Sequence, residues 1–117
     1  MNANIKELLA TFKMRTTADA TNMKELINRK VKPLKWEFSE YTDSDGENHT
    51  VLAMDLETDD GKIKGIYRTE VKAFIEKFRV YMDVFGAIPD DERPLITITG
   101  VKSQRGNPYI NFDIVEE

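Results

Sequence analysis

The sequence IKGIYRTEVKAFIEKFRVYMDVFG, residues 63–86, changes from the pattern of a strand to the pattern of a helix. Its first six residues are typical of a short β-strand. Thr69 is suited to cap a following helix, Gly86 to end it, and Pro89 prevents its continuation. Between these residues the apolar side chains recur at helical spacing and form one broad stripe: Val71, Phe74, Ile75, Phe78, Met82 and Phe85. The stretch therefore predicts a strand followed by an amphipathic helix that needs an apolar surface to cover.

Four further strands are predicted around this unit. In 31–41, Leu34, Trp36 and Phe38 alternate with polar residues, and Pro33 marks the start of a strand or an edge strand. The turn 42–48 leads into a strand at 49–57. Downstream, strands are predicted at 95–101 and 108–115, joined by the loop 102–107. Gly65 predicts a β-bulge or a close backbone approach in the strand 63–68.

Two helical pieces precede the strands. In 3–13, apolar side chains fall at the spacing of a short amphipathic helix: Ile5, Leu8, Leu9 and Phe12. Asn22 is a good N-cap for a second piece, and Glu25 completes a capping-box pattern. We therefore expect a helical extension over 1–30 and one β-rich domain over 31–117.

The predicted order of the domain is β-β-β-α-β-β. A helix between the third and fourth of five short strands is the connectivity of the OB-fold, a small Greek-key barrel in which the helix plugs one end. The fold class expected is therefore mainly β with helices, a five-stranded OB-fold barrel. An open five-stranded sheet with the helix packed on it is the alternative.

Composition excludes several classes of protein. The chain has 117 residues, a net charge of −4, one histidine and no cysteine, which excludes disulfide and thiolate chemistry. Charged residues interrupt the N-terminal apolar residues, and no run is long enough to span a membrane, so we expect a cytoplasmic protein. The charge lies in blocks: 1–36 has eight Lys or Arg and three Asp or Glu, 37–61 has nine Asp or Glu and no Lys or Arg, and 62–82 has six Lys or Arg and two Asp or Glu.

The sequence contains no strong motif that would indicate a catalytic site. A lone histidine, His49, beside a turn offers no metal cluster, and no glycine-rich phosphate loop is present. The turn at 43–48 lacks the terminal glutamate spacing of a calcium loop. We expect no enzyme activity, no cofactor and no metal. A small metal-dependent hydrolase is a weaker alternative. It would use four turn aspartates, and aspartate is already expected at these positions because it favours turns: Asp43, Asp45, Asp59 and Asp60.

Patterns for nucleic-acid binding are stronger. Strand alternation places Tyr41 and Tyr109 on faces opposite the predicted core. Cations and aromatic residues then fall where an OB-fold holds single strands, on its second and third strands and the loops between strands 1–2 and 4–5. The predicted binding residues are Lys35, Tyr41, Lys62, Lys64, Tyr67, Arg68, Lys102, Arg105 and Tyr109. Each tyrosine has a structural alternative because tyrosine favours strands. Other basic residues either extend this face or solvate a short helix: Lys24, Arg29, Lys30 and Lys32.

Three motifs carry a family resemblance over residues 18–116: the hairpin EYTDSDGENHTVL, the helix ending DVFG, and the hairpin pattern Lys-Ser-x-x-Gly-x-x-Tyr at 102–109. With them the chain resembles the small OB-fold single-stranded-DNA-binding proteins of phages and prophages. The resemblance implies a non-catalytic protein that coats single strands without strong sequence preference during phage replication or recombination, in the bacterial host cell. It matches the family's basic hairpin to Lys102 and Arg105 and its aromatic residue to Tyr109.

The resemblance has one departure, and one other class of function stays open. Bacterial single-strand binders usually end in a long acidic tail that recruits partners, whereas only Glu116 and Glu117 follow the last predicted strand. This departure concerns the recruitment of replication or recombination proteins through such a tail and does not concern DNA binding. The apolar residues of 3–13 either pack on the barrel of the same chain or pair with a second subunit, and we slightly favour the second alternative, a homodimer. The alternative function is an OB-fold adaptor that binds a protein through its acidic surface at 37–61.

Overall fold

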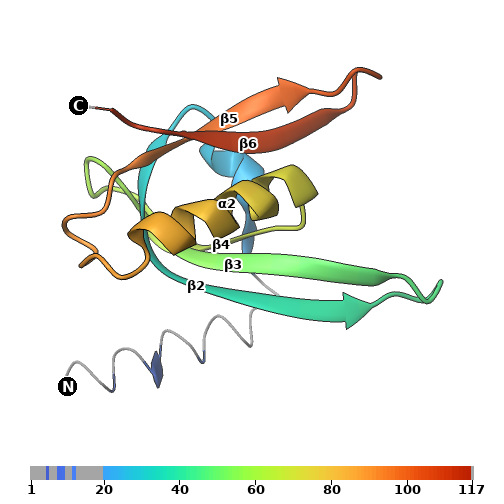
Figure 1. Cartoon of the computed structure of the whole chain (residues 1–117), viewed down its shortest axis with the longest axis horizontal. Coiled ribbons are helices and arrows are strands. Elements are labelled where there is room, and N and C mark those ends of the chain that lie inside the picture. The colour runs from blue at the N-terminus through green and yellow to red at the C-terminus, as the bar shows by residue number, and fades with distance from the viewer. Residues whose placement is uncertain (1–4, 6–7, 10–11, 13–19, 117) are drawn as a thin grey trace.

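The structure is a computed structural model that describes residues 5, 8, 9, 12 and 20–116, and its fold is mainly β (Figure 1). Six strands form one curled sheet in the order β1-β4-β3-β2-β5-β6, and α2 lies against it. The elements are β1 (Thr21–Asn22), the 3₁₀ turn η1 (Met23–Leu26), β2 (Lys30–Thr42), β3 (Asn48–Thr58), β4 (Lys64–Thr69), α2 (Lys72–Phe85), β5 (Ile96–Lys102) and β6 (Pro108–Ile114).

The mainly β prediction is confirmed, but the predicted number of strands is wrong. The two-residue strand β1 pairs in parallel with β4 and makes a sixth strand. Counted with β1, the helix α2 follows the fourth strand rather than the third. Strand alternation in a single sequence could not reveal β1, because a strand of two residues has no period and its partner is more than forty residues away.

The sheet curls around its longest strand, β2. At its first residues β2 pairs on both sides, because Val31 lies opposite Thr58 of β3 and opposite Ile96 of β5. Farther along, β2 pairs with β3 alone as far as Thr42, opposite Asn48. The β2–β3 and β5–β6 hairpins therefore diverge, and Figure 1 shows their tips at one end of the molecule. The segment from β1 to η1 contacts both β4 and β5 and lies between these two halves.

A β-bulge occurs in β2 and not at Gly65. The register shifts between Pro33, opposite Leu56, and Lys35, opposite Asp55, so that Leu34 is the extra residue. Proline cannot donate a ladder hydrogen bond, which favours an irregularity at this point. Gly65 keeps a regular register with Leu56, so the predicted bulge there is wrong.

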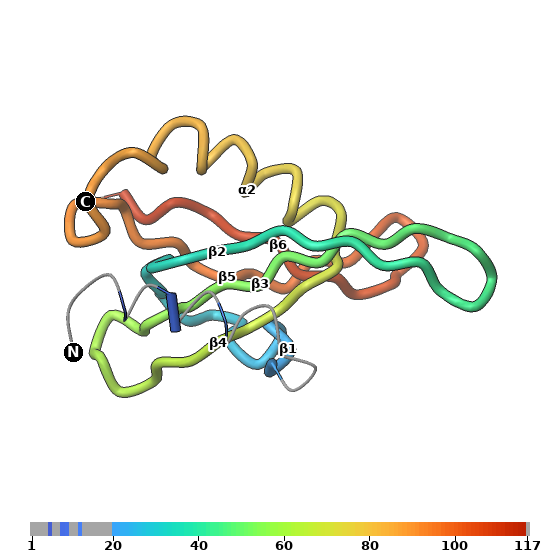
Figure 2. Tube along the Cα trace, turned by 90° about the horizontal axis from the view of Figure 1, so that it is seen from below, coloured from blue at the N-terminus to red at the C-terminus, as the bar shows by residue number. Residues whose placement is uncertain are grey.

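The core lies between the concave side of the sheet and α2 (Figure 2). Phe74 and Phe78 of α2 are fully buried, as their helical spacing predicts, and η1 adds Met23 and Leu26. The Trp36 ring meets Phe78 edge-on at 5.2 Å between centroids. Burying a large side chain stabilises the fold by about 1.5–3 kcal/mol. The aromatic side chains of α2, Phe74 and Phe78, therefore make a large part of the apolar contact between helix and sheet.

The ends of α2 differ in detail from those predicted. The N-cap position is Val71, and Thr69 instead accepts the Val71 amide at its Oγ1, 3.1 Å away. Gly86 is the C-cap, but its φ of −64° is right-handed, so the helix does not end through a left-handed glycine. At the other predicted helix, the Asn22 side chain accepts the Lys24 amide at 3.0 Å, which confirms the cap, although the element is a 3₁₀ turn.

Candidate nucleic-acid interface

The β5–β6 hairpin carries the basic loop that sequence analysis singled out. Its turn is closed by backbone bonds between Ser103 and Asn107 and from the Gly106 amide to the Ser103 carbonyl, at 2.9 and 2.8 Å. Gly106 has a φ of +82°, a left-handed conformation that glycine adopts without strain. Arg105 is exposed at the tip and Lys102 at the end of β5. The turn therefore holds two cations outward on a compact loop.

A groove of about 500 Å³ runs along the base of this hairpin. Tyr109 lines it, together with the apolar side chains of Ile27 and Val71. The charged residues among its described lining are two lysines, Lys24 and Lys102. An aromatic ring, apolar walls and two cations are the combination that binds the bases and phosphates of a single strand.

A second, smaller hollow of about 340 Å³ extends this groove toward β4. It shares Asn22 and Val71 with the first, so the two form one continuous surface, called here the hairpin track. Arg68 adds a cation to the track, and Glu70 adds a carboxylate. The track therefore joins the β5–β6 hairpin to the end of β4.

Tyr41 reaches the same region from the β2–β3 hairpin. Its hydroxyl donates to Glu70 Oε1 at 2.7 Å, and this bond raises the pKa of Tyr41 above its usual value. Its ring stacks on the imidazole of His49, with centroids 4.9 Å apart and planes 18° from parallel. Tyr41 is still 46% exposed, as strand alternation predicts. A stacked, half-exposed pair of rings therefore lies at the far end of the hairpin track.

His49 is held by carboxylates on two elements. Its Nε2 lies 2.7 Å from Asp43 Oδ2 and its Nδ1 lies 3.7 Å from Glu70 Oε1. The bond to Asp43 raises the pKa of His49, and the same bond lowers the pKa of Asp43. Asp43 Oδ1 also accepts the amides of Asp45 and Glu47, each at 2.9 Å. Asp43 thus organises the turn, and protonated His49 adds positive charge near the track.

Asp43 and His49 also form a group with Glu47 that has the right atoms for a metal ion. Their ligand atoms lie within 4.8 Å of one another. Both oxygens of Asp43 already accept or face hydrogen-bond partners within the hairpin. The group is therefore explained by turn structure, and no metal chemistry is derived from it.

The structure brings together only some of the predicted binding residues. Lys102, Tyr109 and Arg68 line the hairpin track, with Tyr41 beside it and Arg105 at the hairpin tip. The other four predicted binding residues lie outside the track. Lys35 is half-buried opposite Asp55, Lys64 is exposed opposite Glu57, Lys62 is exposed in the β3–β4 turn, and Tyr67 packs against the core.

Lys24 and Asn22 are track residues that sequence analysis did not include. Lys24 was interpreted either as part of a basic face or as solvation of a short helix, and Asn22 as a cap. Asn22 does cap η1, and the same turn brings both residues to the groove. Their clustering with Tyr109 depends on the fold, so no local pattern could have identified it.

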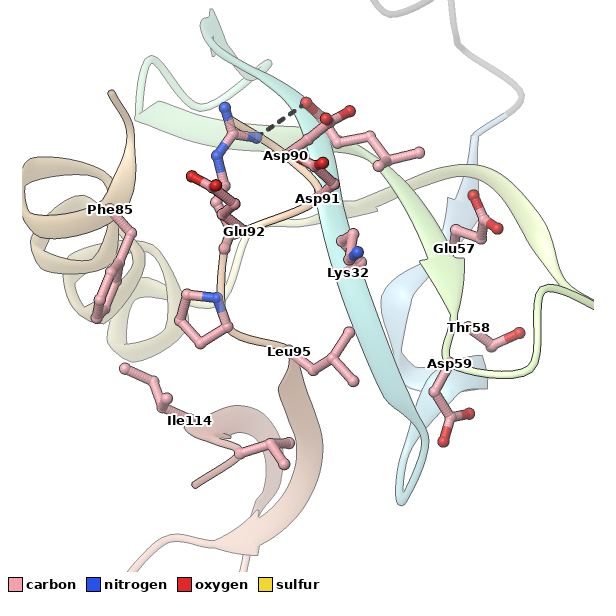
Figure 3. Close-up of a pocket in the computed structure, with 14 residues that line it drawn as sticks. Lys32, Glu57, Thr58, Asp59, Phe85, Asp90, Asp91, Glu92, Leu95 and Ile114 are labelled. Carbon is pink, nitrogen blue, oxygen red and sulfur yellow. Dashed lines mark hydrogen bonds between the residues drawn. The ribbon is translucent and has the colours of Figure 1, made fainter. Parts of the chain in front are cut away.

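A third hollow, of about 690 Å³, is lined by the loop before β5 and by the ends of α2, β3 and β6 (Figure 3). In Figure 1 the loop before β5 lies at the end of the molecule opposite the hairpin tips. The hollow is called here the acidic groove. Its described lining includes five carboxylates, from Glu57, Asp59, Asp90, Asp91 and Glu92, and two cations, from Lys32 and Arg93. Such a surface repels a polyanion, so this larger hollow is not a candidate for a nucleic-acid interface.

Comparisons with known proteins add no identification. No protein-family model, curated protein or solved structure matches this chain. Among the described residues, no helix combines the length and the apolar character that crossing a membrane requires. The assignment of function therefore rests on the hairpin track and its chemistry.

Proposed function

We propose that the protein binds single-stranded DNA along the hairpin track, largely without sequence preference. The observation that carries the proposal is the groove in which Tyr109 lies with Lys24 and Lys102, since no carboxylate is among its described lining residues. Lysines neutralise phosphates, and an aromatic ring stacks on any base. The net charge of −4 does not oppose this function, because the acidic groove that contributes to it is at the other end of the molecule.

The topology supports an OB-fold interpretation of the sheet. Without β1, the strands lie in the order β4-β3-β2-β5-β6, with α2 between β4 and β5 along the chain. Numbered from β2, this is the order 3-2-1-4-5 with the helix after the third strand, as the OB-fold connectivity requires. An OB-fold binds oligonucleotides on its second and third strands, framed by the 1–2 and 4–5 loops. The β2–β3 and β5–β6 hairpins are those loops here.

The biological role proposed follows from this binding. A protein of this kind coats single strands during phage replication or recombination, in the cytoplasm of the bacterial host, and has no catalytic step. Replication or recombination proteins are its proposed protein partners. Tyr109 supplies stacking, Lys24 and Lys102 neutralise phosphates, and Arg105 at the hairpin tip extends the cationic surface.

Substitutions in the hairpin test the proposed interface. Tyr109→Ala is expected to weaken binding of an oligo-dT strand by roughly 1–3 kcal/mol with an unchanged salt slope, since stacking releases no counterions. Lys102→Ala with Arg105→Ala is expected to weaken binding and to reduce the salt slope by about 2. Fluorescence anisotropy at several salt concentrations measures both quantities.

The matched control removes the same types of charge away from the track. Lys32 lines the acidic groove, and Arg79 is an exposed residue of α2 whose guanidinium lies over the Phe38 ring. Lys32→Ala with Arg79→Ala is expected to leave the affinity within about twofold. Lys24→Ala tests the groove itself and is expected to reduce the affinity as Lys102→Ala does. Equal losses in the control and hairpin variants would refute the proposed location.

A further inference from the structure

The acidic groove combines an apolar floor with a rim of carboxylates. Four apolar residues line it, from β2, α2, the loop before β5, and β6: Leu34, Phe85, Leu95 and Ile114 (Figure 3). Three consecutive acids of the loop after α2, Asp90 to Glu92, border the same hollow. Partly exposed apolar side chains with a polar rim are characteristic of a protein-binding surface.

Arg93 contributes one positive charge to the groove, but its N–H groups are bonded to backbone carbonyls of the chain itself. Its Nε donates to the Ile88 carbonyl at 2.9 Å, and its Nη1 donates to the Pro33 and Leu34 carbonyls, both at 3.3 Å. Its cation also lies 4.8 Å from the Trp36 ring centroid. Lys32 is the other cation among the described lining residues. The groove therefore presents more negative than positive charge to a partner.

The N-terminal region of the same chain has the complementary chemistry. Ile5, Leu8, Leu9 and Phe12 are helical and between 42% and 69% exposed, and they are called here the apolar stripe. The sequence around the stripe is basic, with Lys6, Lys13 and Arg15 against Glu7. An apolar stripe flanked by cations fits an apolar floor rimmed by carboxylates.

We propose that the acidic groove is the docking site for the apolar stripe of a second copy of this chain. The apolar side chains fill the floor, and the positive charge of the sequence around the stripe complements the carboxylates of Asp90, Asp91 and Glu92. The contact joins different surfaces of the two copies, so it supports either a chain of copies or a reciprocal exchange. The proposal goes beyond DNA binding and does not depend on it. Copies joined in this way would bind along one strand cooperatively.

Sedimentation velocity of the full chain without DNA tests the contact. The wild type is expected to associate as its concentration rises from about 1 to 200 µM, in the weak range typical of small interfaces. Asp91→Lys with Glu92→Lys is expected to weaken association at least about tenfold, because charge repulsion replaces attraction. Leu8→Glu is expected to do the same from the other side of the contact.

Two further variants separate this contact from a general charge effect. Asp45→Lys with Glu47→Lys makes the same charge change in the β2–β3 turn and is expected to associate as the wild type does. Lys6→Glu with Lys13→Glu, mixed with the groove variant, is expected to restore association in the mixture. Circular dichroism verifies that every variant is folded.

Either of two outcomes would overturn the proposal. If the wild type stays monomeric at 200 µM, the groove does not bind a second copy, and a different protein would be the partner to test. Association that the groove substitutions leave unchanged would place the interface between copies elsewhere. Because DNA is absent from these measurements, neither outcome changes the result of the oligonucleotide titrations.

Discussion

The imidazole Nε2 of His49 lies 2.7 Å from the Asp43 Oδ2 across the β2–β3 hairpin, and both side chains remain partly exposed. The bond joins the strand after the turn to the residue that organises the turn. Glu70, which borders the hairpin track, is 3.7 Å from the other ring nitrogen. The charge of His49 is therefore linked both to the hairpin and to the proposed interface.

We predict that the pKa of His49 lies above its usual 6.5, because protonation strengthens its bond to Asp43. The stabilisation from this shift is fully present below the unfolded pKa of His49 and is lost as pH rises through the folded value. The lowered pKa of Asp43 has the opposite effect, with stabilisation lost as pH falls through its folded value. The pair thus stabilises the hairpin most between about pH 4 and 6.5.

An NMR titration of the ring protons measures this directly, since the chain has one histidine. Asp43→Asn is the matched variant, because the amide oxygen still accepts turn hydrogen bonds but carries no charge. Its His49 pKa is expected to fall toward 6.5. An identical histidine pKa in the two proteins would contradict the assigned cause.

Glu70 is the carboxylate of the hairpin track, and we predict that Glu70→Gln increases affinity for single-stranded DNA by about threefold at low salt. Glutamine retains an oxygen that accepts the Tyr41 hydroxyl, so the ring keeps its position. Glu76→Gln on the exposed side of α2 is the control and is expected to have little effect. Anisotropy titrations of both variants make the comparison, and a weaker Glu70→Gln complex would be inconsistent with phosphate near this residue.

Arg93 is predicted to stabilise the fold through its shape as well as its charge. Its planar guanidinium donates to several backbone carbonyls and packs over Trp36, and a lysine cannot reproduce that fork. Arg93→Lys is expected to lower the free energy of unfolding by about 1–3 kcal/mol. Urea unfolding followed by fluorescence of the single tryptophan, Trp36, measures the loss.

The control for Arg93 is Lys72, whose exposed side chain makes only a loose pair with Glu76 at 3.9 Å. Lys72→Ala is expected to change the free energy of unfolding by less than about 0.5 kcal/mol. If Arg93→Lys were equally mild, the carbonyl contacts of the guanidinium would not hold the loop after α2 to β2.

Local sequence patterns predicted most of the elements because each has a clear period. The helical spacing of Phe74 and Phe78 places them in the core, where the structure finds them, and Trp36 and Phe38, which alternate along β2, are partly buried against it. Tyr81 is a core residue that the sequence did not predict, since the apolar spacing along α2 favoured its neighbour Met82. Tyr81 is buried because its hydroxyl donates to the Pro94 carbonyl at 2.9 Å, and burial raises its pKa to about 12.

The candidate site was harder to predict, because it depends on how distant segments meet. Tyr109 and Lys102 were identified from one hairpin, whereas Lys24 reaches them only through the position of η1. Tyr67 was interpreted as a surface ring, but the alternation along β4 places it with Met54 against the core. The acidic groove also joins residues from several strands and loops, and no sequence window contains them together.

Binding of single-stranded DNA is measured by a fluorescence-anisotropy titration of the wild-type protein with labelled oligo-dT at low and moderate salt. Duplex DNA of equal length serves as the control. We predict saturable binding of the single strand that weakens as salt rises, with far weaker binding of the duplex. No binding of the single strand at low salt, or equal binding of strand and duplex, would contradict this prediction.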